Sequence, residues 1–182
     1  MINHKMEFLS RIKVEPEEES LNFTWGAELI PEKTIDRNEL VLSVSVGGTY
    51  DIVEKYAIHA HPNDYPYKKQ TKYITFRYPD GGKKKVVYEI VETLEIDITN
   101  WESVFAERVF AENVEERLSS YILERMKEFN YEKNIPYKYY ILNKIIELNN
   151  NTRPLKNNAG GWYYKLEDLL STEDIIHTTR FK

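Results

Sequence analysis

The sequence predicts one α+β domain built on a bent, mostly antiparallel sheet with helices at its rim. Three observations lead to this fold class: a long hairpin pattern over residues 71–97, further alternating segments at 40–46 and 139–146, and a helical region over 100–129. Apolar residues that alternate with polar ones have the two-residue period of a strand, whereas spacings of three and four indicate a helix. Strands and helices without a regular βα repeat are typical of the α+β class.

The hairpin pattern is the strongest local signal in the chain. Alternating β-branched and aromatic residues predict strands over 72–78 and 85–96, joined by a turn at Asp80-Gly81-Gly82. The second strand is long for a single strand. We therefore expect it to bend or to carry a β-bulge near Glu92-Thr93.

The segment before the hairpin predicts a strand, a glycine turn and a short helix. Residues 40–46 alternate as a strand, Gly47-Gly48 ends it, and Thr49 is a suitable N-cap for a helix to about Ile58. Free backbone N–H groups at such a turn can hold a phosphate, although the Lys-Ser/Thr ending of a P-loop is absent. Two interpretations of the glycine pair stay open, a tight turn and a phosphate cradle.

Two histidines follow this helix, and a loop with two prolines comes next. His59 and His61 have no third ligand of suitable type nearby except Asp64, so the sequence predicts no metal site. Proline disfavours regular structure, and residues 62–67 are therefore expected to form a loop that leads to the hairpin.

The region after the hairpin predicts two helices, or one kinked helix, over 100–129, with an interruption near 111–113. Its apolar positions recur at spacings of three and four, and its other face is charged, as in a helix that packs on a core. Across the whole chain, the side chains predicted to be mostly buried are Phe76, Tyr88, Ile90, Leu94, Leu118, Ile122 and Ile141.

The C-terminal third predicts one long strand and several short elements. Both faces of 139–146 are apolar, so we expect an interior strand. A short extended segment at 162–164 follows. The pattern then predicts a helical turn at 166–170 and another from Ser171 to Ile176.

Length and composition limit the possible functions. The chain has 182 residues, of which 41% are hydrophobic and 30% charged, and this suits one folded domain over 1–182. No apolar run approaches the about 20 residues of a membrane helix, and the N-terminus lacks an apolar signal core. The absence of cysteine excludes disulfides and thiolate chemistry and fits a reducing, cytoplasmic location. With a net charge of −5, any nucleic-acid site must be a local basic patch.

Several of these motifs together resemble PUA-like modules of the EVE/ASCH type, which are found near restriction and other bacterial defence enzymes. The resemblance covers about residues 40–176 and is interrupted by a helical insertion at about 100–130. The motifs that carry it are the aromatic-rich strand at 73–76, the hairpin glycines Gly81-Gly82, the valine-glutamate-x-leucine strand at 91–95 and the closing turn at 164–170.

The resemblance implies recognition of RNA, or of a flipped or modified base, with no chemistry and no cofactor of its own. Such recognition needs an aromatic platform and local cations. For each single residue a structural role stays open, since loop aromatics can cover the end of a sheet and lysines protect a hairpin edge. The candidate stacking residues are Trp25, Tyr65, Tyr67, Trp162 and Tyr163, and the candidate phosphate-binding residues are Lys68, Lys69, Lys83, Lys84, Lys85 and Arg153.

Two other classes of function are alternatives. A small acidic protein-interaction protein, such as a phage- or defence-associated inhibitor of a nucleic-acid enzyme, fits the net charge and the 14 tyrosines. An enzyme is less favoured, because the sequence has no nucleophile elbow and no HExxH motif. We therefore expect a binding protein with no catalytic residues.

Overall fold

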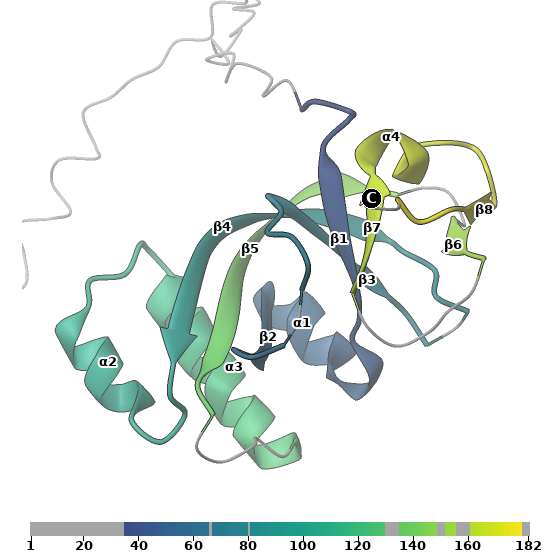
Figure 1. Ribbon diagram of the computed structural model, residues 1–182. Coiled ribbons are helices and arrows are strands. Elements are labelled where there is room, and N and C mark those ends of the chain that lie inside the picture. The colour runs from purple at the N-terminus through teal and green to yellow at the C-terminus, as the bar shows by residue number, and fades with distance from the viewer. Residues whose placement is uncertain are drawn as a thin grey trace, which may run out of the picture. The chain divides into compact units, whose positions relative to one another are not determined.

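The computed structural model describes residues 35–65, 67–79, 81–129, 135–148, 152–155 and 161–179. The main element is a six-stranded sheet with the strand order β2-β5-β4-β3-β1-β7 (Figure 1). Its strands are β1 (Leu40–Ser45), β2 (Ile58–Pro62), β3 (Tyr73–Arg77), β4 (Val86–Ile96), β5 (Tyr137–Glu147) and β7 (Gly161–Lys165). Within this sheet, only β1 and β3 pair in parallel among the described residues. The predicted α+β class with a mostly antiparallel sheet is therefore confirmed. The sheet is open and does not close into a barrel.

The predicted hairpin is present as the antiparallel pair β3–β4. Its turn uses positive φ angles of +82° at Gly81 and +76° at Gly82, which only glycine adopts without strain. The amide of Tyr78 donates to the carbonyl of Lys83 at 3.0 Å and closes the turn. The register between β4 and β5 shifts between Ile90 and Glu92, which confirms the predicted irregularity in the long strand.

In the described part of the chain, four α-helices accompany this sheet: α1 (Tyr50–Tyr56), α2 (Trp101–Glu107), α3 (Val114–Glu128) and α4 (Leu166–Leu169). The predicted helical region therefore divides into α2 and α3, with Asn113 at a positive φ just before α3. Helices α1 and α3 contact each other, since the carboxylate of Glu124 accepts hydrogen bonds from Lys55 and Tyr56, each at 2.6 Å. Figure 1 shows α1 and α3 beside β2 and β5, and α4 next to β7.

Two hydrophobic clusters pack on the sheet. The larger includes Leu42, Phe76 and Ile122, and the second includes Val41 and Tyr164. Because side chains alternate along a strand, consecutive residues of β1 belong to different clusters. The side chains predicted to be mostly buried are buried, except Ile90, which is half-buried.

Two local predictions were wrong, and a third was met only in part. Residues 58–62 form β2, although Ile58 was expected to end a helix and Pro62 to begin a loop. Ala57 ends α1 at φ +50° without a glycine to mark the boundary. Residues 171–176 were expected to form a helical turn, but Ile175–Ile176 form the short strand β8, which pairs with β6 (Arg153–Pro154). Thr49 occupies the predicted N-cap position of α1, but its hydroxyl donates to the carbonyl of Val46 at 2.8 Å and makes no capping hydrogen bond.

The glycine pair Gly47-Gly48 forms a short 3-10 turn, Gly47–Thr49, in which the amide of Thr49 donates to the carbonyl of Val46 at 2.9 Å. This bond uses one of the amides that a phosphate cradle would need. Among the described residues, no helix is both long enough and apolar enough to span a membrane.

Candidate functional site

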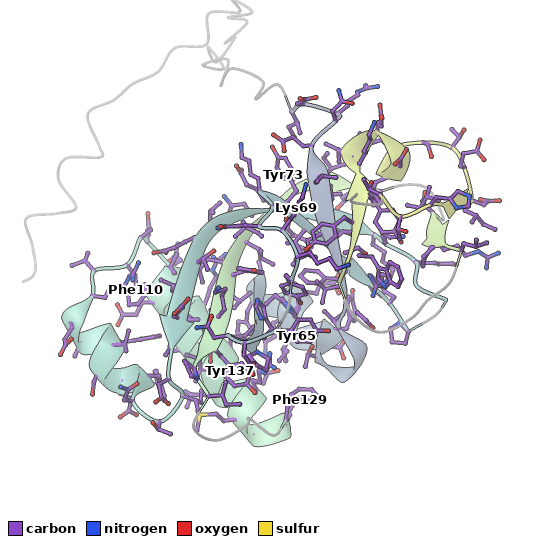
Figure 2. The ribbon with its side chains drawn as sticks, viewed as in Figure 1. Tyr65, Lys69, Tyr73, Phe110, Phe129 and Tyr137 are labelled. Carbon is purple, nitrogen blue, oxygen red and sulfur yellow. The ribbon has the colours of Figure 1, made fainter. Side chains whose placement is uncertain are left out.

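An aromatic pocket opens where the end of β2, the loop that follows it, β4 and β5 meet. The cavity has a volume of about 140 Å³. Figure 2 shows Tyr65 and Tyr137 near one end of the sheet and Lys69 farther along the loop. The residues that line the pocket are His61, Tyr65, Tyr67, Lys69, Gln70, Thr93, Lys138 and Tyr140.

Four rings form the apolar wall of this pocket. The imidazole of His61 lies 4.6 Å from the ring of Tyr67 and 5.2 Å from the ring of Tyr140, measured between centroids. Tyr65, which is 40% exposed, lies 4.8 Å from Tyr67 and forms the outer part of the wall. Rings at these distances give a polarizable surface of the kind on which a planar ligand stacks.

His61 adds a fixed polar group to the wall. Its Nδ1 lies 2.8 Å from the carbonyl oxygen of Pro62, and because a carbonyl can only accept, Nδ1 carries the proton. Burial lowers the pKa of His61, and the charges of Lys138 and Arg125 lower it further, against the opposing effect of the bond to Pro62. The ring is therefore neutral at pH 7. Its Nε2 is an acceptor with no hydrogen-bond partner among the described residues.

The loop that carries Tyr65 to Gln70 is attached to the edge strand β7. The hydroxyl of Tyr163 accepts from the amide of Lys69 at 2.9 Å and donates to the carbonyl of Lys69 at 3.1 Å. A Cβ on Gly161 would lie 2.7 Å from the ring of Tyr67, so only glycine lets that ring approach the strand. Tyr163 and Gly161 thus hold the pocket wall in place.

Cationic side chains lie at the edge of the pocket. Lys68 and Lys69 are exposed on the loop. Lys138 lines the pocket from β5, and its ammonium lies 3.6 Å from the carboxylate of Glu95. The pocket therefore combines an aromatic interior with positive charge at its rim, although the chain as a whole is acidic.

Among the residues proposed from the sequence, Tyr65, Tyr67 and Lys69 meet in this pocket, and Lys68 lies next to it. Tyr163 is buried at 4% exposure, and its hydroxyl is engaged with the loop. Tyr163 therefore supports the pocket wall and does not offer the stacking surface that was expected from the sequence.

The hairpin lysines lie apart from this pocket. Lys85 is exposed, and its ammonium stands 4.2 Å from the ring centroid of Tyr78. Lys83 is half-buried. Lys84 is only 1% exposed, so the expectation that it presents a cation to a phosphate on the surface is not met. The reason is local: Lys84 follows the turn and points its side chain over the ring of Tyr164.

Two further candidates also lie elsewhere. Arg153 is exposed on β6, and Trp162 packs half-buried against the second hydrophobic cluster. Trp25 lies outside the described residues. The structure therefore does not bring Arg153 or Trp162 into the aromatic pocket.

Sequence reasoning did not select His61, Gln70, Thr93, Lys138 and Tyr140 as binding residues. His61 was assessed only as a metal ligand, and Tyr140 only as part of a strand. The sequence signal that could have found them is the run of tyrosines in β5, the strand that pairs with β2. Residues opposite each other in a sheet share a face, so a tyrosine of β5 can lie beside a histidine of β2. His59 pairs with Tyr140 in this way. Among the described residues, no three carboxylate or imidazole side chains are grouped so as to hold a metal ion.

Comparisons with known proteins find similar solved structures. No protein-family model matches the sequence, and no curated protein matches it. The chain is similar to the crystal structure of ASCH from Zymomonas mobilis, with 16% identity over 62% of this chain and 73% of that chain and a TM-score of 0.34. A mutant form of that ASCH protein matches with 15% identity over 64% of this chain and 77% of that chain and a TM-score of 0.32.

Proposed function

We propose that this chain is a non-catalytic nucleic-acid recognition module that takes an unstacked base, normal or modified, into the aromatic pocket. The observation that carries the proposal is the convergence of Tyr65, Tyr67, Tyr140 and His61 around one cavity with Lys69 at its edge. Bases of single-stranded RNA are recognised in this manner, by stacking on aromatic rings and by hydrogen bonds to their edges.

The roles of the residues follow from their chemistry. The tyrosine rings supply the stacking surface, and the neutral His61 offers an acceptor within the wall. Lys68 and Lys69 contact the phosphates on either side of the inserted base. Because the net charge of the chain is −5, long-range attraction does not bring nucleic acid to the protein, and the local cations must do so.

A titration of the purified protein with labelled single- and double-stranded RNA and DNA tests the proposal. We expect binding at low salt with a preference for single strands. Tyr65→Ala removes one exposed ring and should weaken binding by about 1–3 kcal/mol per stacked base, or roughly 5- to 150-fold. The dependence of binding on salt should remain unchanged, because no charge is lost.

Two double variants with the same change in charge locate the phosphate contacts. Lys68→Glu with Lys69→Glu should weaken binding and flatten its salt dependence, since each lost phosphate contact removes about 0.7–0.9 from the log–log slope. The matched control, Lys83→Glu with Lys85→Glu on the hairpin, should have a much smaller effect. A larger loss of binding in the Lys83/Lys85 variant than in the Lys68/Lys69 variant would place the nucleic-acid interface on the hairpin. Failure of the wild-type protein to bind any of the four nucleic acids at low salt would refute the proposal and favour a protein partner.

A further inference from the structure

A second cavity lies next to the aromatic pocket, and Gln70 lines both of them. The second cavity has a volume of about 380 Å³, compared with about 140 Å³ for the aromatic pocket, so it is large enough for a base with its ribose. We call it the polar cavity. Besides Gln70, the residues that line it are Asp36, Asn38, Glu39, Leu40, Thr71 and Lys72.

One wall of the polar cavity is the turn that leads into β1. The amide of Glu39 donates to the carbonyl of Asp36 at 3.1 Å and closes this turn. The carbonyls of Arg37 and Glu39 accept from the amides of Glu167 and Leu166 at the start of α4, each at 2.9 Å. The backbone that carries the acidic side chains is therefore held in place.

The other wall is the loop that precedes β3. Both backbone groups of Lys69 bond to the hydroxyl of Tyr163. The carbonyl of Lys72 accepts from the amide of Ile90 at 2.8 Å. Gln70 lies between these two anchored residues, so the side of the loop that separates the two cavities has a fixed backbone.

The side chains around the polar cavity offer mainly hydrogen-bond acceptors. Asp36 Oδ1 accepts from the backbone amide of Asn38 at 2.9 Å and from its side-chain amide at 3.3 Å. Glu39 is exposed, and its carboxylate forms no ion pair within the described part of the chain. The ammonium of Lys72 lies 3.5 Å from the carboxylate of Glu89, which offsets its charge. The cavity therefore repels a phosphate and suits a group that presents N–H donors.

We infer that the polar cavity binds a guanine base directly next to the base in the aromatic pocket, an inference that rests on the proposed function. Guanine presents two adjacent donors along one edge, N1–H and the 2-amino group, and a carboxylate offers two acceptor oxygens that match them. Glu39 supplies this carboxylate, and the amide of Gln70 donates to the guanine O6. Adenine, cytosine and uracil have no such pair of adjacent donors, so they gain less from the same site.

The continuity of the two cavities favours a nucleic-acid strand over a cationic peptide. Because Gln70 lines both cavities, consecutive nucleotides of one single strand can reach them. Lys68 and Lys69, both exposed, directly precede Gln70 in the loop, where they meet the phosphates of that strand. The same lysines would repel a cationic peptide.

The probe is a labelled single-stranded oligouridine whose central dinucleotide is varied through all combinations of bases. When the full chain is titrated at low salt, the RNAs that contain a guanine should bind most tightly. Inosine lacks only the 2-amino group of guanosine and so removes one of the two donors. Its replacement of guanosine should weaken binding by about 10- to 150-fold, the usual effect of losing a hydrogen bond to a charged group.

Three variants assign the preference to the polar cavity. Glu39→Gln keeps the shape of the side chain but turns one acceptor into a donor, so RNAs with guanosine and with inosine should bind equally. Glu128→Gln, on the exposed end of α3, removes the same charge and should keep the full preference for guanine. Tyr65→Ala should weaken all the RNAs by a similar factor and keep the preference, because Tyr65 lines the aromatic pocket and not the polar cavity.

The outcomes separate this inference from the proposed function. Equal binding of all the dinucleotides would overturn the inference alone and favour a cationic peptide in the polar cavity. A preference for another base, or a guanine preference that Glu39→Gln retains, would also overturn it while the proposed function stands. Failure of the wild-type protein to bind any of the RNAs would overturn both.

Discussion

At the scale of single residues, the buried histidines of β2 link folding to acidity. His59 is 5% exposed, and both of its ring nitrogens lack a hydrogen-bond partner among the described residues. Burial lowers the pKa of His59 well below its ordinary value, and the nearby His61 and Arg125 lower it further. The same direction holds for His61. Both rings are therefore neutral in the folded protein at pH 7.

The sign of the resulting pH dependence follows from which state binds more protons. Below a pH of about 6.5, the histidines of the unfolded chain become protonated while those of the folded chain stay neutral. The stability is thus fully present above about pH 6.5 and decreases as the pH falls toward the lowered folded pKa values. Each histidine contributes up to about 1.4 kcal/mol per pH unit to this decrease.

The variant His59→Phe tests this residue-scale account. It keeps an aromatic ring next to Phe76 and Tyr140 but cannot take up a proton. The free energy of unfolding, measured by denaturant titration between pH 4 and 7, should therefore depend less on pH by up to about 1.4 kcal/mol per unit. His177→Gln, at an exposed position, is the control. An unchanged slope in His59→Phe would show that His59 is protonated in the folded state.

At the scale of elements, the contact between β7 and the loop of the aromatic pocket determines the position of Tyr67. An added Cβ at Gly161 would lie 2.7 and 2.8 Å from two carbons of the Tyr67 ring and 3.2 Å from a methyl group of Leu42. Distances below about 3 Å are not tolerated in packed interiors, so the ring must move. A methyl group added at Gly161 would therefore displace the Tyr67 ring of the pocket, although Gly161 does not line the pocket itself.

We predict that Gly161→Ala lowers both stability and nucleic-acid affinity. Overpacking of this kind costs about 1–3 kcal/mol. A double-mutant cycle with Tyr67→Ala isolates the cause: once the ring is absent, the added methyl group should cost little, and the coupling energy should be about 0.5–3 kcal/mol. Thermal and denaturant unfolding of the four proteins measure it. Simple additivity of the two changes would show that the ring and β7 are not in contact.

The elements also show what the sequence pattern can and cannot reveal. The hairpin β3–β4, the interior strand β5 and the helix α3 were predictable, because each has a long, regular apolar period. Strand β2 was not, because it has only five residues, which follow α1 almost directly, and such a short run gives a weak period. The residues of the aromatic pocket were likewise predictable only in part. Tyr65, Tyr67 and Lys69 are close in sequence, whereas His61, Lys138 and Tyr140 join them only through the pairing of β2 with β5.

Lys84 illustrates the limit of reading charge from sequence. All three consecutive lysines after the glycine turn were candidates for phosphate contacts, and at least two were expected to project into solvent. In the structure, Lys84 lies buried over the ring of Tyr164, between the half-buried Lys83 and the exposed Lys85. A pattern of charges therefore predicts a binding surface only when the facing of each side chain is known.

At the scale of the whole molecule, an acidic chain is proposed to bind a polyanion through few cations. The net charge is −5, and the cations at the aromatic pocket are Lys68, Lys69 and Lys138. Two or three phosphate contacts correspond to a log–log salt slope of about −1.4 to −2.7. A much steeper slope would require a larger basic surface than the described residues form at this pocket.

The ion pair between Lys138 and Glu95 gives a way to separate local from global charge. Glu95 accepts a hydrogen bond from Asn63 at 3.2 Å and lies 3.6 Å from the ammonium of Lys138. Glu95→Gln keeps an oxygen for Asn63 but releases Lys138, so nucleic-acid affinity should rise and the slope should steepen by about 0.7–0.9. Glu128→Gln, on the exposed end of α3, changes the net charge equally but frees no cation near the pocket. It should raise the affinity slightly at low salt and leave the slope unchanged. Equal effects of the two variants would mean that the field of the whole molecule, and not the rim of the aromatic pocket, controls binding.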